Sequence, residues 1–242
     1  MSGVAAEQAD VPVVRLSGIH AVVLDLDDTL YPERAYAFSG FRAVGAWLRE
    51  RLVCGVDPGA RMCELYDGGE RGRVFNRLLA EIGCDEADRL VPEMLRCYRE
   101  HWPAVDLFAD ARAALEAWHG RFRLGLISDG PLPSQQRKVE ALTLQRWFDT
   151  IILTDEWGRE YWKPHLRAFR ETENRLNCCG PHVVYIADNC GKDFLGPRRL
   201  GWRTVWVSRP GGLYRDVAAP AGGEPECRIE SFAQLDLRGE SP

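Results

Sequence analysis

The sequence predicts an α/β protein in which a mainly parallel sheet forms the core and a block of helices is inserted into it. Three observations predict this fold class. Residues 21–24 form a wholly apolar run, as is typical of a central strand covered on both faces. Residues 31–106 show only helical periodicity, and strands alternate with helices after residue 106. Such alternation is typical of parallel sheets with right-handed crossovers.

The length and charge of the chain narrow the classes of function. Its 242 residues are enough for a substantial core, arranged as one domain with an insertion or as two unequal domains. The net charge of −5 provides no basic surface for nucleic acid, and no segment has the length of an apolar membrane span. The first ten residues lack the basic start and apolar middle of a secretion signal. We therefore expect a cytoplasmic protein, monomeric or homodimeric, that binds neither nucleic acid nor membrane.

Three aspartates follow the first strand without a break: Asp25, Asp27 and Asp28. If the backbone stays extended, the side chains of Asp25 and Asp27 point to the same side. Two such carboxylates repel each other unless a cation or a shared proton relieves the repulsion. This stretch therefore predicts a metal site, a base, or both.

Three helical stripes fill the segment after this strand. The apolar positions of each stripe recur at helical spacing, and turns rich in glycine separate the stripes. The stripes are Ala37, Phe41, Val44 and Leu48; Val74, Leu78 and Ile82; and Leu90, Met94, Leu95 and Tyr98. The chain is thus expected to divide into a flexible arm (1–17), a core (18–30 and 107–242) and an all-helical insertion (31–106).

The elements after residue 106 are expected in regular order. A long loop rich in glycine and proline over 208–226 predicts a segment that is functional or mobile. A last short strand, for example 227–229, and a helix are expected over 226–237. The other expected strands are 122–127, 150–153, 182–187 and 204–207, and the helices between them are 134–142, 164–176 and 192–200.

Polar side chains follow several of these strands. Because the carboxyl ends of parallel strands lie at one rim of the sheet, these side chains are expected to meet there. Lys163 and Pro164 are expected to open the helix after the third strand, with proline at a favoured first helical position. The residues at strand ends are Asp25 and Asp27 after the first strand, Ser128, Asp129 and Gly130 after the second, and Asp188 after the fourth.

In their order and spacing, these segments resemble the four motifs of the haloacid dehalogenase-like hydrolase superfamily. The matching residues are 25–29, Ser128, Lys163 with Pro164, and 188–193, and the resemblance spans residues 20–207. It implies a Rossmann-like three-layer core and a mobile cap made by the helical insertion. It also implies Mg²⁺ as cofactor and, most often, phosphatase chemistry through an aspartyl-phosphate.

The resemblance implies a role for each matching residue. Asp25 is the expected nucleophile and a metal ligand. Asp27 gives its backbone carbonyl to the metal, and its side chain protonates the leaving alcohol and then activates water. The crowded acids are expected to keep Asp27 protonated near neutrality. Lys163 supplies a catalytic positive charge. Phosphate or substrate is bound by Thr29, Ser128, Asp129, Gly130 and Lys163. The metal site is completed by Asp188 and Asp193.

Asp129 departs from the superfamily pattern, which most often has an uncharged polar residue at this position. A further carboxylate beside a phosphate is repulsive unless it is protonated, pairs with Lys163 or turns away. We hypothesise that Asp129 bonds backbone amides or a substrate hydroxyl.

Aspartate at position 27 favours the phosphatase branch, because a leaving halide needs no proton and dehalogenases generally lack this residue. Phosphomutase is the next alternative, followed by 2-haloacid dehalogenase and by a non-catalytic phosphate-binding or scaffold protein. The expected partner is a small phosphorylated metabolite such as a phosphosugar or a nucleotide. Candidate contacts of this substrate in the cap are Arg34, Tyr36, Arg42, Arg73 and Asn76.

Overall fold

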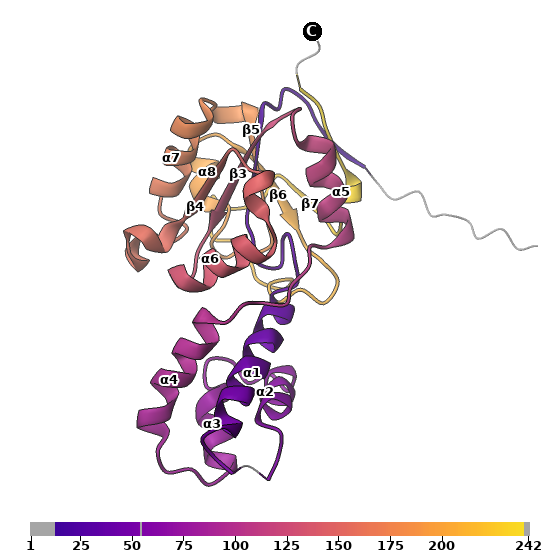
Figure 1. The fold of residues 1–242 in the computed structure, drawn as a ribbon. Helices are drawn as coiled ribbons and strands as arrows, with labels where there is room; N and C mark the ends of the chain where they lie inside the picture. The colour runs from indigo at the N-terminus through magenta and orange to yellow at the C-terminus, as the bar shows by residue number, and fades with distance from the viewer. Residues whose placement is uncertain (1–12, 54, 240–242) are drawn as a thin grey trace, which may run out of the picture.

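The computed structural model describes residues 13–53 and 55–239, and it confirms the predicted α/β core with an inserted helical cap. In Figure 1 the sheet and its flanking helices form one lobe, and helices α1–α4 form a second lobe below it. The chain leaves the core after strand β2 (Ala21–Leu24) and returns to it before α5 (Ala109–Trp118). The cap is therefore an insertion joined to the core by two adjacent passages of the chain.

The main sheet has six parallel strands in the order β4-β3-β2-β5-β6-β7. Strand β2 lies in its interior, where Leu24 is paired in register with Leu126 on one side and Ile186 on the other. This position explains the continuous apolar run of β2, since all four residues are buried. The other strands are β3 (Arg123–Ser128), β4 (Thr150–Leu153), β5 (Val183–Ala187), β6 (Arg203–Val207) and β7 (Cys227–Ile229).

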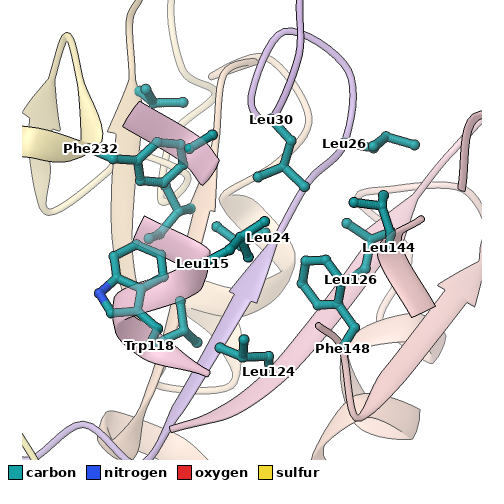
Figure 2. Close-up of a cluster of buried hydrophobic side chains, with 14 of the residues drawn as sticks. Leu24, Leu26, Leu30, Leu115, Trp118, Leu124, Leu126, Leu144, Phe148 and Phe232 are labelled. Atoms are coloured by element: carbon teal, nitrogen blue, oxygen red, sulfur yellow. The ribbon is translucent and has the colours of Figure 1, made fainter. Parts of the chain in front are cut away.

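Alternate residues of the central strands enter two separate hydrophobic clusters, one on each face of the sheet. Figure 2 shows the first cluster, in which Leu24 and Leu126 pack with Leu115 and Trp118 of α5. The second cluster contains Phe169 of α7 (Arg167–Leu176). Helices α6 (Leu132–Ala141) and α8 (Leu195–Arg199) complete the core. The buried faces fix where the strands end, and so they fix the position of the polar residues that follow.

The cap has its own hydrophobic core, which contains Phe41, Val44, Leu78 and Met94 from the predicted stripes. Ile82 is only partly buried at the edge of this core. The cap helices are α1 (Glu33–Arg49), α2 (Pro58–Asp67), α3 (Val74–Glu81) and α4 (Ala87–Glu100).

The elements differ from the sequence predictions at several boundaries. Helix α7 begins at Arg167, so Pro164 lies before the helix and not at its first position. Helix α5 was not among the predicted elements. The predicted last helix is a 3-10 turn, Phe232–Gln234, followed by strand β8 (Leu235–Leu237).

The predicted arm over residues 1–17 lies mostly outside the described residues. Its final part, β1 (Val14–Leu16), pairs in parallel with β8 as a second, two-stranded sheet, because the pairing buries Leu16 and Leu237 in the core. Among the residues that the structure describes, no helix combines the length and the apolar character needed to cross a membrane.

Candidate active site at the carboxyl rim of the sheet

A cavity of about 360 Å³ lies between the cap and the carboxyl ends of the central strands, since residues of both line it. Asp25 follows β2, Asp129 follows β3 and Asp188 follows β5, and all three line this cavity. Asp27 and Gly130 line it as well. The parallel sheet thus brings these residues together at one rim, as the strand ends predicted.

Lys163 lies at the centre of the acidic groups. Its ammonium, Nζ, donates to Asp25 Oδ1 at 2.5 Å and lies 2.7 Å from Asp193 Oδ1. It also donates to the hydroxyl of Tyr185 at 3.0 Å. Lys163 and Asp193 have fully buried side chains. Burial alone would lower the pKa of this lysine, but the charges of Asp193 and Asp25 outweigh burial and raise the pKa well above its usual value.

Three buried carboxylates, Asp25, Asp188 and Asp193, each place one oxygen within 4.8 Å of the others. Burial raises the pKa of Asp188 well above its usual value, and repulsion by Asp25 and Asp193 adds to this shift. Burial also raises the pKa of Asp25 to about 6, although Lys163 partly opposes the increase. Because Lys163 supplies only one positive charge to three acids, a divalent cation fits this cluster. Mg²⁺ prefers oxygen ligands of this kind.

Asp27 lies in a different environment from Asp25. Its carboxylate accepts hydrogen bonds from Lys138 Nζ at 2.8 and 2.9 Å, and from the hydroxyl of Tyr31. Burial raises the pKa of Asp27, but Lys138 outweighs burial and holds the pKa below its usual value. The expectation that Asp27 stays protonated near neutrality is therefore wrong, because Lys138 pairs with it.

Asp129 is held by the protein on both of its oxygens. Oδ1 accepts hydrogen bonds from Thr154 Oγ1 at 2.7 Å and from the backbone N–H of Lys163 at 3.1 Å. Oδ2 pairs with Lys192 Nζ at 3.1 Å. The charge of Asp129 is thus balanced by Lys192. Of the two expected partners, a backbone amide is confirmed, and a substrate hydroxyl stays a prediction.

The predicted phosphate-binding side chains are buried at the same rim. Thr29 is fully buried, and its hydroxyl has no hydrogen-bond partner among the described residues. Ser128 Oγ donates to Gln135 Oε1 at 3.2 Å. Gly130 has φ of +130°, and a Cβ at this position would lie 2.4 Å from Gln135 Nε2. Neither Thr29 nor Ser128 reaches the lining of the cavity, whereas Gly130 does.

The cap supplies different residues from those expected. Tyr36 lines the cavity, but Arg34 is directed away and pairs with Asp67. Arg42, Arg73 and Asn76 are not among the lining residues. The cavity is lined instead by Glu33, Leu95, Tyr98 and Arg99 of the cap, Ser134, Gln135 and Lys138 of α6, and Trp162, Lys192 and Tyr214.

Lys138 and Gln135 illustrate why sequence reasoning missed part of the site. Both residues lie within a predicted helix, and their separation of three positions places them on one face of it. That spacing was the available signal, but it does not reveal which face approaches the end of β2.

The chain is similar in sequence to known proteins. The family model described as haloacid dehalogenase-like hydrolase matches residues 22–207. A glyceraldehyde 3-phosphate phosphatase of Methanopyrus kandleri is 29% identical over 210 residues, which cover 82% of this chain and 87% of that protein. A phosphoserine phosphatase of Thermus thermophilus is 30% identical over 154 residues, covering 63% of this chain and 60% of that protein.

A solved structure has a similar fold. It is the HAD-hydrolase YfnB of Bacillus subtilis bound to magnesium, with a TM-score of 0.63 and 18% identity. The similarity covers 90% of this chain and 96% of that chain.

Proposed function

The chain belongs to the haloacid dehalogenase-like hydrolase family, and from this premise we propose that it is a Mg²⁺-dependent phosphatase of a small phosphorylated metabolite. The observation that carries the proposal is the position of Asp25 in the cavity wall, bonded to Lys163 and adjacent to Asp188 and Asp193. In this position the carboxylate of Asp25 can attack phosphorus, and Lys163 balances its negative charge.

In the first step, a carboxylate oxygen of Asp25 forms a bond to phosphorus, the bond between phosphorus and the substrate oxygen breaks, and the leaving oxygen takes a proton from Asp27 when Asp27 is protonated, or from water. Lys163 stabilises the charge on Asp25 and on the phosphoryl oxygens. Asp25, Asp188 and Asp193, with the backbone carbonyl of Asp27, would hold Mg²⁺, which when bound screens the repulsion between the nucleophile and the phosphate.

In the second step, a water oxygen bonds to phosphorus, the bond between phosphorus and Asp25 breaks, and a proton of the water passes to Asp27. The lowered pKa of Asp27 suits this role, because a base must be ionised before it accepts a proton. From Asp27 the proton passes to solvent or to the leaving oxygen of the next substrate. Asp27 therefore serves proton transfer, whereas Asp25 attacks phosphorus in the first step and leaves it in the second.

The cavity favours a small substrate with polar groups. Its volume of about 360 Å³ suits one small molecule, and its aromatic wall includes Tyr36, Tyr98 and Tyr214. Glu33 and Arg99 add groups of opposite charge from two cap helices. The relatives named above act on glyceraldehyde 3-phosphate and phosphoserine, which are small phosphorylated metabolites. We include small phosphosugars and nucleotides in the same class.

A panel assay tests this proposal. Phosphate release is measured with triose phosphates, phosphoserine, sugar phosphates, nucleotides and p-nitrophenyl phosphate, in Mg²⁺ and in excess EDTA. We expect turnover of at least one compound in Mg²⁺ and its loss in EDTA. Absence of phosphate release from every compound would overturn the proposal, and halide release from 2-haloacids or phosphate transfer between two positions of a sugar would replace it.

A further inference from the structure

One face of α6 holds the carboxylate of Asp27 through two side chains. Lys138 Nζ donates to both oxygens of this carboxylate, and Gln135 Nε2 donates to Oδ2 at 3.3 Å. The Tyr31 hydroxyl donates to Oδ1. Each oxygen therefore accepts two hydrogen bonds, and the carboxylate has a defined orientation in the cavity wall.

Gln135 also connects Asp27 to the loop after β3. The same Nε2 donates to the backbone carbonyl of Asp129 at 2.9 Å, and Oε1 accepts the hydroxyl of Ser128. Gly130 leaves the space that the amide of Gln135 occupies, as a Cβ there would clash with it. A single buried amide thus joins the loops that follow β2 and β3.

Lys138 and Asp27 form a largely buried ion pair. Its burial is better explained by the orientation that it gives to Asp27 than by a gain in stability. The side chain of Lys138 is 4% exposed and that of Asp27 is 20% exposed. Buried ion pairs add little net stability, because the cost of removing two charges from water offsets their attraction. Their geometric precision, by contrast, is what a general base requires. The adjacent residues Gln136 and Arg137 are exposed on the opposite face of α6 and provide matched controls.

We propose that Lys138 and Gln135 are positioning residues, which hold Asp27 where it accepts the proton of the water that attacks phosphoryl-Asp25. This inference rests on the proposed function. The step is the hydrolysis described above, in which the water oxygen bonds to phosphorus, the bond to Asp25 breaks, and one water proton passes to Asp27. In this proposal Lys138 and Gln135 act through the hydrogen bonds that they donate to Asp27.

The inference predicts that Lys138→Met slows hydrolysis of the phosphoenzyme more than its formation. With p-nitrophenyl phosphate, formation needs little proton transfer because p-nitrophenolate is a good leaving group. Stopped-flow mixing of Lys138→Met with this substrate and Mg²⁺ should show a burst of about one p-nitrophenolate per active site, followed by turnover reduced about 10²-fold or more. Acid quenching during the slow phase should recover phosphoenzyme close to one per chain.

Two further variants separate positioning from a general loss of structure. Lys138→Arg keeps the charge and should restore part of the steady-state rate, and Arg137→Met should match wild type. Gln135→Leu keeps all charges and should show the same burst with a smaller loss of rate. Thermal unfolding of each variant identifies any variant that fails to fold. If Lys138→Met fails to fold, Gln135→Leu still tests the inference.

A double-mutant cycle gives the decisive result. In an Asp27→Asn background, Lys138→Met should lower the rate no further, because its effect passes through Asp27. Equal losses in both backgrounds, or slow turnover of folded Lys138→Met without a burst, would overturn the inference. If wild type itself forms no phosphoenzyme, the proposed function fails instead, so the two failures are distinguishable.

Discussion

The ammonium of Lys163 lies 2.5 Å from the carboxylate of Asp25, although the two residues are 138 positions apart in the sequence. Both side chains are buried, and the same ammonium contacts Asp193. The contact joins the end of β2 to the loop after β4 and places a fixed positive charge beside the proposed nucleophile.

Replacement of this lysine should therefore affect both catalysis and stability. Lys163→Met should lower kcat by about 10²–10³-fold, because the charge that stabilises the attacking carboxylate and the phosphoryl group is lost. It should also lower the free energy of unfolding by about 3–5 kcal/mol, because Asp25 and Asp193 are left buried without this partner. Steady-state kinetics and urea unfolding measure the two effects. A fully active Lys163→Met would contradict this role.

Removal of one proposed metal ligand should have opposite effects with and without Mg²⁺. In EDTA, Asp188→Asn should raise the melting temperature, since repulsion among the three acids is reduced and the raised pKa of Asp188 shows that its charge is unfavourable there. With Mg²⁺, wild type should gain stability, and the variant should bind the ion at least about 10-fold more weakly.

Thermal unfolding across a Mg²⁺ titration checks this prediction. Asp216→Asn is a suitable control, because Asp216 is exposed and makes no hydrogen bond or ion pair among the described residues. Equal Mg²⁺ dependence of wild type and Asp188→Asn would argue against a metal at this cluster.

The strand ends could be predicted from sequence, whereas the contacts of α6 could not. The apolar run before Asp25 places that residue at the carboxyl end of a buried strand, which is a local property of the chain. The partner of Asp27 depends on how α6 packs against the sheet. The sequence shows that acids lie next to Asp27, but it does not show that Lys138 contacts Asp27. The predicted direction of the pKa shift of Asp27 was therefore wrong.

Prediction of the cap from the sequence is limited in the same way. Its helical stripes follow from periodicity, and the cap core contains most of the residues predicted for it. The residues that face the cavity depend on how the cap sits on the core, and so Arg34, which pairs with Asp67, could not be distinguished from Arg99, which lines the cavity. Periodicity identifies the buried face of a helix but not which polar residues meet a ligand.

Asp129 should act through its contacts with Thr154, Lys163 and Lys192. Asp129→Asn keeps an oxygen that can accept from Thr154 and from the Lys163 N–H, and it loses only the pair with Lys192, so kcat should change by less than about 10-fold. Asp129→Leu loses every one of these contacts and should reduce kcat at least about 10-fold more. Steady-state kinetics of both variants on one substrate test this. Complete loss of activity in Asp129→Asn would indicate direct contact with the substrate.

Asp110 should make the stability of the core depend on pH. Burial raises its pKa, but hydrogen bonds from Arg209 and Ser231 outweigh burial and hold the pKa below its usual value. The ionised carboxylate therefore stabilises the fold above pH of about 4, and this contribution is lost as the pH falls through the lower folded-state pKa. Asp110→Asn should cost about 1–2 kcal/mol at pH 7, after allowance for solvent screening.

Urea unfolding at pH 7 and at successively lower pH measures this contribution. The difference between wild type and Asp110→Asn should narrow below pH of about 4. Asp106→Asn, at an exposed position without a hydrogen bond or ion pair among the described residues, should match wild type. A difference that stays constant down to acidic pH would show that the charge of Asp110 contributes nothing.

The central claim is that Asp25 carries the phosphoryl group during turnover. The most direct test is a rapid acid quench of wild type with its best substrate, followed by borohydride reduction, which converts a phosphorylated aspartate to homoserine that peptide mass spectrometry can locate. We predict homoserine at position 25 and at no other aspartate, and neither homoserine nor turnover in Asp25→Asn. Full-rate hydrolysis by Asp25→Asn, or homoserine at a different position, would contradict the account.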